Sequence, residues 1–218
     1  MASLPGVLIT DFDGTITDRD FYLLIMERYM GPGAMDIWDA YREGRISHFY
    51  AMQSFFSHAP TDEAELEALL RDTAPDPRFG EAARALQAAG WDLVIVSAGC
   101  SWYIERILLA SGVRAAVHSN PGQIAAGKGL VMELATHAEF FDPDVGVDKS
   151  AVVEDALTRY ERVAFAGDGP PDVKPALLVE PDRRFARGFL AEELTRRGER
   201  FVSFTAWHEA VTALLKQG

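Results

Sequence analysis

Two aspartates with one residue between them follow an apolar run near the start of the chain. In the segment GVLITDFDGTITDRD, the run Val7–Ile9 leads into Asp11 and Asp13, and a glycine comes next. Stability does not require acids at the end of a strand, so these carboxyl groups are candidates for chemistry. Two neighbouring carboxyl groups in different environments let one stay ionised while the other holds a proton. The pattern predicts Asp11 as a nucleophile and Asp13 as a general acid.

Four more polar side chains occupy similar places, just after an apolar run or at the start of a predicted helix. They are Ser97 in VIVSAGC, Lys149 in GVDKSAVVEDAL, and Asp168 and Asp172 in VAFAGDGPPD. The carboxyl ends of parallel strands share one edge of a sheet, where ligands bind. A parallel sheet can therefore bring all four side chains to the first two aspartates.

The chemistry that suits this set is transfer of a phosphoryl group to a carboxylate. A phosphate ester is anionic, so an anionic nucleophile needs a cation in order to approach it. Asp11 and Asp168 can hold Mg²⁺, a hard ion that prefers oxygen ligands. Lys149 would supply a second positive charge for the nucleophile and the phosphate.

A phosphate-binding turn is expected directly after the strand that contains Ser97. Its hydroxyl, together with the backbone N–H groups of Ala98 and Gly99, can bind phosphate oxygens at the N-terminus of the next helix. These two small residues leave the backbone open to a ligand.

Some nearby residues have more than one interpretation. Asp172 can ligate the metal, orient Lys149 or hold the waters of the metal. Trp102 and Tyr103 open a helix beside the phosphate-binding turn, where they can contact the substrate or pack in the core, and core packing is the more frequent role for such aromatic residues. Cys100 is expected to pack in the core, because the sequence offers it no activating base.

Short apolar runs alternate with helical patterns along most of the chain, which is typical of an α/β sheet. The runs are continuous, as in parallel strands that are buried on both faces. They are Val7–Thr10, Trp91–Ser97, Arg114–Ser119, Arg162–Gly167 and Ala176–Glu180. Crossover helices are predicted at Arg78–Ala89, Ser101–Ser111, Lys149–Arg159 and Arg187–Arg197, and a hairpin at Gln123–Leu134. The predicted fold is α/β with a Rossmann-like parallel sheet.

One section breaks this alternation of strands and helices. Residues 17–73 show only helical patterns, at Phe21–Tyr29, Ala34–Arg42, Ser47–Phe56 and Asp62–Arg71, with Ser47 and either Thr61 or Asp62 as plausible N-caps. A helical block after the first strand predicts a small cap over the carboxyl edge of the sheet. The predicted domains are a catalytic core of residues 1–16 and 74–218 and a helical cap of residues 17–73.

Composition excludes several classes of function. Hydrophobic residues make up 48% of the 218 residues and charged residues 25%, as in ordinary soluble domains. The net charge of −12 disfavours nucleic acid and anionic membranes as partners. No apolar run approaches the roughly 18 residues that a membrane span needs. The single cysteine excludes an intramolecular disulfide and favours a cytoplasmic location.

Taken together, the motifs resemble those of phosphatases of the haloacid dehalogenase (HAD) superfamily. The order DFDGT, a strand-end serine, a lysine and GDGPPD is similar to the four-part signature of that superfamily and spans almost the whole chain. The resemblance implies the HAD core fold, an aspartyl-phosphate intermediate on Asp11, and a general acid/base at Asp13. It also implies Mg²⁺ held by Asp11, the backbone carbonyl of Asp13, and the fourth-motif acids Asp168 and Asp172.

The helical insertion is similar to the cap of the phosphoserine phosphatase-like branch. Phosphoserine phosphatases usually carry Glu at the position of Asp20 and Arg at the position of Phe55. The chain is more similar to the 2-hydroxy-3-keto-5-methylthiopentenyl-1-phosphate phosphatases of methionine salvage, in DFDGTITDRD, the Arg-Ile-Ser of the cap and FARGFLAEEL. The predicted specificity residues of the cap are Asp20, Arg42, Arg45 and Phe55, with the apolar Phe55 suited to a thioether tail.

Three alternatives stay open beside a methionine-salvage phosphatase. They are a phosphoserine phosphatase, a phosphotransferase of the same superfamily, and a binding protein that has kept the fold without the activity. The last is disfavoured because the nucleophile, the general acid, the lysine and the metal acid are all present. The predicted partner is a small phosphorylated metabolite.

Overall fold

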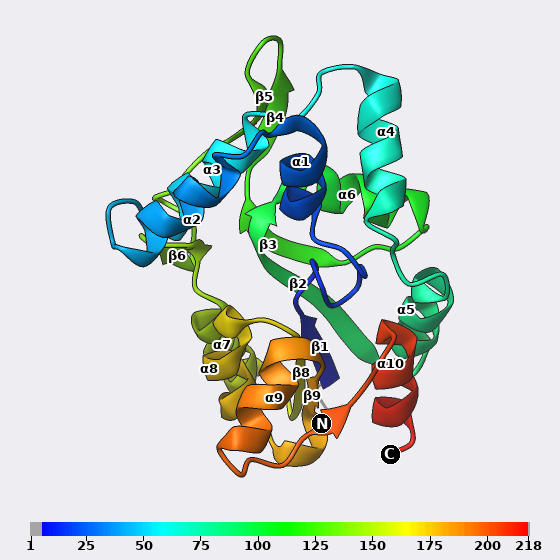
Figure 1. The fold of residues 1–218 in the computed structure, drawn as a ribbon. Coiled ribbons are helices and arrows are strands. Elements are labelled where there is room, and N and C mark those ends of the chain that lie inside the picture. The colour runs from blue at the N-terminus through cyan, green and yellow to red at the C-terminus, as the bar shows by residue number, and fades with distance from the viewer. Residues whose placement is uncertain (1–5, 218) are drawn as a thin grey trace.

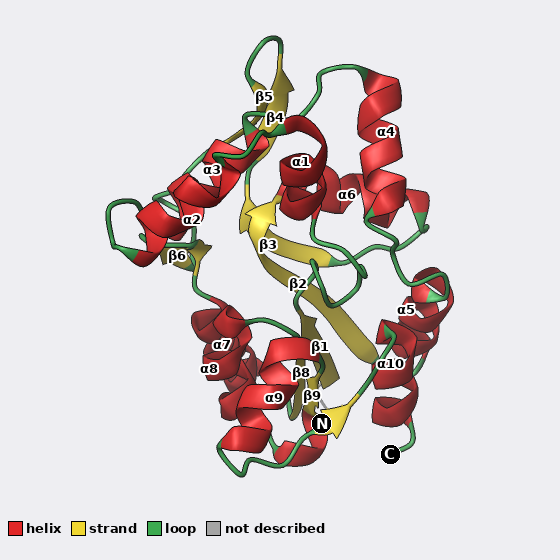
Figure 2. Ribbon diagram, viewed as in Figure 1, coloured by secondary structure: helices red, strands yellow, loops and turns green. Residues whose placement is uncertain are grey.

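The computed structural model describes residues 6–217 and confirms the predicted α/β fold. A six-stranded parallel sheet has the order β10-β9-β8-β1-β2-β3, and helices lie on both sides of it (Figure 1 and Figure 2). β1 lies inside the sheet and pairs in parallel with β2 and β8. The strands are β1 (Gly6–Thr10), β2 (Trp91–Cys100), β3 (Ala116–Asn120), β8 (Arg162–Gly167), β9 (Arg184–Ala186) and β10 (Val202–Ser203).

Two hydrophobic clusters cover the two faces of the sheet. Successive side chains of a strand point to opposite faces, so Leu8 of β1 joins one cluster and Val7 and Ile9 join the other. The first cluster includes α5 (Phe79–Ala88), α6 (Ser101–Ala110) and α10 (Trp207–Leu215). The second includes α7 (Lys149–Arg159), α8 (Val173–Leu178) and α9 (Gly188–Arg196). This cover on both faces explains why β1 is a continuous apolar run.

Four helices gather beyond the end of β1, as Figure 1 shows. They are α1 (Phe21–Tyr29), α2 (Ala34–Arg42), α3 (His48–Phe56) and α4 (Glu63–Asp72). The predicted N-caps are confirmed, since Ser47 accepts from the Tyr50 N–H and Asp62 from the Glu65 N–H. The two connections to the sheet meet in an isolated antiparallel bridge between Thr17 and Pro75. The domain boundary at 17 and 73 stays a prediction.

The predicted hairpin is confirmed as the antiparallel pair β4 (Gly122–Ala125) and β5 (Gly129–Met132). Its second strand packs against α3, where the Gln53 side chain donates to the Leu130 carbonyl and accepts from the Met132 N–H. A second pair, β6 (Phe141–Asp142) and β7 (Gly146–Val147), has a loop that binds the start of the same helix. There the Asp144 side chain accepts from the His48 N–H. Two late segments of the chain therefore support α3.

The prediction of a strand at Ala176–Glu180 is wrong, because most of this segment lies in the helix α8. A short apolar run cannot be told from a buried helix by periodicity alone. The strand that pairs with β8 on the side away from β1 is β9, which contains the buried Arg184. The Arg184 guanidinium donates to the carbonyls of Ala176 and Val179, and this explains how a cation is accommodated in a buried strand. No helix within residues 6–217 is long and apolar enough to cross a membrane.

Candidate active site

The predicted polar residues meet at one edge of the sheet. Asp11 follows β1, Ser97 lies in β2, and Asp168 follows β8. Lys149 is the first residue of α7, and Asp172 ends a single 3₁₀ turn before α8. A cavity of about 320 Å³ opens on this edge, and Asp11, Ser97, Lys149 and Asp168 all line it.

A buried lysine lies between two carboxylates. The Lys149 Nζ atom is 2.8 Å from Asp11 Oδ1 and 2.7 Å from Asp172 Oδ1. Burial lowers the pKa of Lys149, but the charges of Asp11 and Asp172 outweigh it and hold the pKa above its ordinary value. The Phe12 N–H also donates to Asp11 Oδ1, at 2.7 Å. Both of these contacts reach Oδ1, so neither engages the other oxygen of Asp11, Oδ2.

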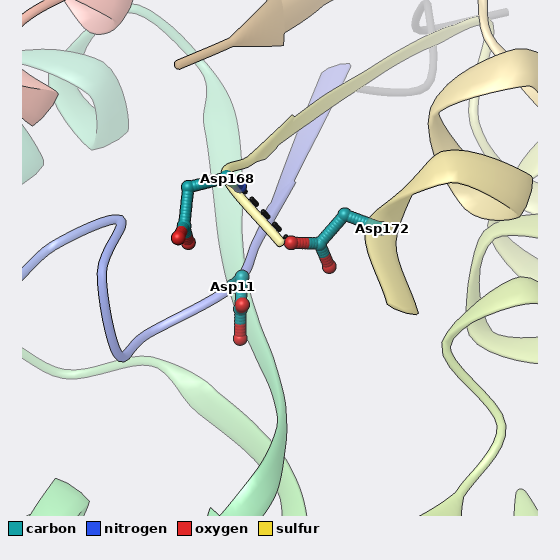
Figure 3. Close-up of side chains that lie close together, drawn as sticks. All are labelled: Asp11, Asp168 and Asp172. Atoms are coloured by element: carbon teal, nitrogen blue, oxygen red, sulfur yellow. Dashed lines mark hydrogen bonds between the residues drawn. The ribbon is translucent and has the colours of Figure 1, made fainter. Parts of the chain in front are cut away.

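Asp172 holds Lys149 and the backbone that follows β8 by hydrogen bonds. Its side chain is fully buried, and Oδ2 accepts from the N–H groups of Asp168 at 3.0 Å and Gly169 at 2.9 Å. Figure 3 shows the first of these bonds, with the Asp11 carboxylate close to the other two acids. With Oδ1 on Lys149, both Asp172 oxygens are engaged. Of the interpretations open at the sequence level, this geometry favours orientation of the lysine.

Three carboxyl groups form a cluster that suits a divalent cation. Oxygens of Asp11, Asp168 and Asp172 lie within 4.8 Å of one another. Burial, with the charge of Asp172 next, raises the pKa of Asp11 well above its ordinary value and that of Asp168 to about 7. Thr15 orients Asp168 by donating to its Oδ1 at 2.6 Å. Hard oxygen donors with excess negative charge fit Mg²⁺, with Asp11 and Asp168 as the residues that would hold it.

Asp13 also lines the cavity, and both of its carboxylate oxygens accept hydrogen bonds. Its Oδ1 accepts from the Phe21 N–H at 3.0 Å, and its Oδ2 accepts from the Tyr103 hydroxyl. Burial raises the pKa of Asp13 to about 6, against the opposing effect of the Tyr103 hydrogen bond. A carboxyl group of this kind can hold a proton near neutral pH and give it to a leaving group.

The turn predicted to bind phosphate is supported by the neighbouring strand β3. Ser97 is buried, and its Oγ accepts from the Gly99 N–H at 3.0 Å. The Asn120 side chain donates to the Ala98 carbonyl at 2.9 Å, and the Ser119 hydroxyl to the Gly99 carbonyl at 3.0 Å. Sequence reasoning missed both supporting residues, which stand in a strand with no motif around them.

The structure brings one of the four predicted cap residues to the cavity. Asp20 lines it, and burial with the nearby charge of Asp13 raises the pKa of Asp20 to about 7. Arg42 and Arg45 are instead largely exposed and form ion pairs with acids of the cap. Phe55 is fully buried between helices and does not line the cavity.

An aromatic wall made by other residues of α1, α2 and α3 lines the cavity instead. Trp38 is at its centre, with ring centroids 5.5 Å from Tyr22, 5.8 Å from Tyr41 and 6.0 Å from His48. The wall consists of Tyr22, Trp38, Tyr41, His48, Met52 and Phe56. The Nδ1 atom of His48 is buried and has no hydrogen-bond partner among residues 6–217. The aromatic density of residues 21–56 was the signal in the sequence that could have indicated this wall.

Residues 8–177 match the haloacid dehalogenase-like hydrolase family. The chain belongs to this family. The predicted resemblance to the haloacid dehalogenase superfamily is therefore confirmed. As an HAD-like hydrolase, the chain is an enzyme whose acids and lysine meet in a single cavity.

Curated relatives and solved structures agree with this membership. The chain is 23% identical over 217 residues to a 2-hydroxy-3-keto-5-methylthiopentenyl-1-phosphate phosphatase of Brevibacillus brevis, covering 95% of this chain and 94% of that protein. It is 23% identical to the protein of the same name from Bacillus velezensis, with 95% and 89% coverage. Among solved structures, a substrate-bound phosphoserine phosphatase superposes with a TM-score of 0.65 at 15% identity, covering 97% of each chain. At that identity, the structural likeness shows the fold alone.

Proposed function

We propose that this HAD-like hydrolase is a Mg²⁺-dependent phosphatase that hydrolyses the phosphate monoester of a small metabolite through an aspartyl-phosphate on Asp11. The observation that carries the proposal is the buried contact of Lys149 with both Asp11 and Asp172, beside the turn of Ser97. A lysine fixed in this way neutralises the nucleophile and attracts a phosphate to the same place. Mg²⁺ held by Asp11 and Asp168 would supply further positive charge.

In the first step, Asp11 Oδ2 attacks phosphorus. The bond from phosphorus to the ester oxygen breaks and leaves its electron pair on that oxygen. Asp13 gives this oxygen its proton, and the alcohol departs. Asp11 then carries the phosphoryl group, whose oxygens are bound by Lys149, the Ser97 hydroxyl and the backbone of the turn.

In the second step, water replaces the alcohol. Asp13, now a carboxylate, takes a proton from water as the water oxygen attacks phosphorus. The bond from Asp11 to phosphorus breaks, inorganic phosphate leaves and Asp13 is protonated again. One ester and one water give one alcohol and one phosphate, and both residues return to their starting states.

The finer proposal concerns the alcohol part of the ester. The aromatic wall with Met52 offers an apolar surface of the kind that accepts a thioether, since sulfur contacts aromatic rings favourably. The unpartnered His48 Nδ1 offers one polar contact in this surface. Together with the names of the curated relatives, this supports 2-hydroxy-3-keto-5-methylthiopentenyl-1-phosphate as the substrate.

A screen of phosphorylated metabolites with Mg²⁺ tests the general proposal, with Asp11→Asn as the paired variant. The asparagine side chain has nearly the same shape but cannot attack phosphorus, so phosphate release should vanish while the circular dichroism spectrum stays unchanged. Turnover by Asp11→Asn at the wild-type rate would exclude the aspartyl-phosphate mechanism.

The substrate proposal is tested by kcat/KM for the methylthiopentenyl ester and for phosphoserine. The thioether ester should be preferred by tenfold or more, which corresponds to about 1.4 kcal/mol in transition-state binding. Trp38→Ala should raise KM for the thioether ester by removing the centre of the aromatic wall. A wild-type preference for phosphoserine would reject the substrate and leave the catalytic assignment intact.

A further inference from the structure

Tyr103 contacts the proposed general acid directly. It lies on α6, the helix that follows the phosphate-binding turn, and its hydroxyl donates to Asp13 Oδ2. The side chain is buried, with only 1% of its surface exposed. The sequence left contact with the substrate and core packing open for Tyr103, but a residue that only packs in the core needs no hydroxyl aimed at an active-site carboxylate.

The ring of Tyr103 also supports the second contact of Asp13. It stacks on Phe21 with ring centroids 4.5 Å apart and an interplanar angle of 21°. The backbone N–H of Phe21 is the group that donates to Asp13 Oδ1. On another side, the Phe56 ring packs edge-on against Tyr103 at 6.0 Å. Tyr103 therefore holds one Asp13 oxygen itself and packs against the residue that holds the other.

Gly99 has no side chain, and the Tyr103 hydroxyl occupies the space that a side chain at position 99 would fill. A Cβ atom at position 99 would lie 1.8 Å from the Tyr103 hydroxyl oxygen and 3.1 Å from Asp13 Oδ2. Any side chain there would push the hydroxyl off the carboxylate. The backbone of the phosphate-binding turn therefore packs directly against the pair of Tyr103 and Asp13.

We infer that Tyr103 is a positioning residue that holds Asp13 in reach of the leaving oxygen, an inference that rests on the proposed phosphatase function. The hydroxyl keeps the carboxyl group in one orientation relative to the bound phosphate. It also stabilises the carboxylate that forms as Asp13 gives up its proton, so the bond strengthens toward the transition state. The benefit is greatest for esters whose alcohols need a proton in order to leave.

Tyr103→Phe tests this inference, because it removes the hydroxyl and keeps the ring. The measurement is kcat/KM with Mg²⁺ for a series of monoesters, from alkyl phosphates to 4-nitrophenyl phosphate. The variant should lose about tenfold on alkyl esters and less than about twofold on 4-nitrophenyl phosphate, whose leaving group needs no proton. The dependence of log kcat/KM on leaving-group pKa becomes steeper. An equal loss on all esters would mean a merely structural role and would overturn the inference.

Tyr22→Phe is the matched control, since it removes another hydroxyl from the same cavity without touching Asp13. It should keep the wild-type leaving-group dependence, whatever its effect on KM. If Tyr22→Phe steepens the dependence as much as Tyr103→Phe does, the role assigned to Tyr103 is wrong.

A double-variant cycle with Gly99→Ala provides a second test. The added methyl group should displace the hydroxyl and reproduce the steeper dependence of Tyr103→Phe. Adding Tyr103→Phe to Gly99→Ala should then cause little further change, because the hydroxyl is already displaced. Fully additive losses would contradict the inference. A wild-type enzyme that hydrolyses no ester would instead overturn the proposed function, and this inference with it.

Discussion

At the scale of single residues, the charge balance of the site depends on Lys149. It is the one lysine or arginine lining the cavity within residues 6–217, among four lining aspartates, Asp11, Asp13, Asp20 and Asp168. A buried ammonium is costly unless it is paired and hydrogen-bonded. Asp172, which does not line the cavity, pairs with this ammonium. Its carboxylate accepts hydrogen bonds from Lys149 and from two backbone N–H groups.

Asp172→Asn should therefore lower both stability and activity. An amide has one acceptor where the carboxylate has two, so either the Lys149 ammonium or the backbone N–H groups of the Asp168 loop lose their partner. Breaking a buried pair in this way costs about 3 kcal/mol, measured by urea unfolding without metal. Asp182→Asn, at an exposed position, is the control. Equal stability of the two variants would show that Asp172 does not support the lysine.

At the scale of elements, α3 is the helix whose position decides the shape of the cavity. It carries His48, Met52 and Phe56 of the aromatic wall. Its position depends on the hairpin β4–β5 and on the loop between β6 and β7, which bind it from the second half of the chain. A change in the hairpin should therefore reach the cavity through α3.

Two glycines of the hairpin allow a matched test of this support. Gly127 and Gly129 both have positive φ angles, of +69° and +67°. A Cβ at 127 would meet no atom within 4 Å, whereas at 129 it would lie 2.5 Å from the Ser57 carbonyl oxygen. Gly127→Ala should cost about 1 kcal/mol of stability through backbone strain. Gly129→Ala should cost roughly 1 to 3 kcal/mol more through overpacking.

Only Gly129→Ala should also raise KM, because it pushes the hairpin away from the end of α3. Thermal unfolding and kinetics of both purified variants are the measurements. A rise in KM in both variants, or in neither, would argue against support of the cavity by the hairpin.

At the scale of the whole molecule, residues that follow β8 in the chain form hydrogen bonds with the two connections between the sheet and the helices α1–α4. Arg187, next to β9, donates to the carbonyls of Gly14 and Thr17 in the first connection. In the second connection, the Asp76 side chain accepts from the His208 N–H of α10 at 2.7 Å. Both residues lie beyond residue 177, where the family match ends. Residues outside the candidate site therefore help to hold the two connections that join the sheet to these helices.

Metal binding should be visible in the stability of the whole molecule. A cation bound by Asp11 and Asp168 in the folded state alone adds about 2.7 kcal/mol when its concentration is 100 times Kd. For a chain of this length, that raises Tm by several degrees, and excess EDTA should reverse the rise and abolish turnover. Asp168→Asn should lose most of the shift. An undiminished shift in this variant would exclude Asp168 as a ligand.

Much of the site could be predicted because its residues stand at strand ends and helix starts. Asp11 and Asp168 follow continuous apolar runs, and Lys149 starts a helix whose cap, Asp148, is adjacent in the sequence. Parallel pairing alone brings such positions to one edge. Prediction was wrong at Ala176–Glu180, where neither length nor periodicity separates a short buried helix from a strand.

The local pattern and the geometry of parallel strands were enough to predict that the acids, the lysine and the turn after Ser97 meet at one edge of the sheet. Only the packing of the folded chain fixes which side of α1, α2 and α3 faces the cavity. On α3 it buries Phe55 away from the cavity and presents His48 and Met52 to it. All three are hydrophobic or aromatic and one turn or two apart, so their pattern cannot separate core from cavity. The packing of α3 against β5 and Asp144, more than 70 residues later in the chain, makes that choice.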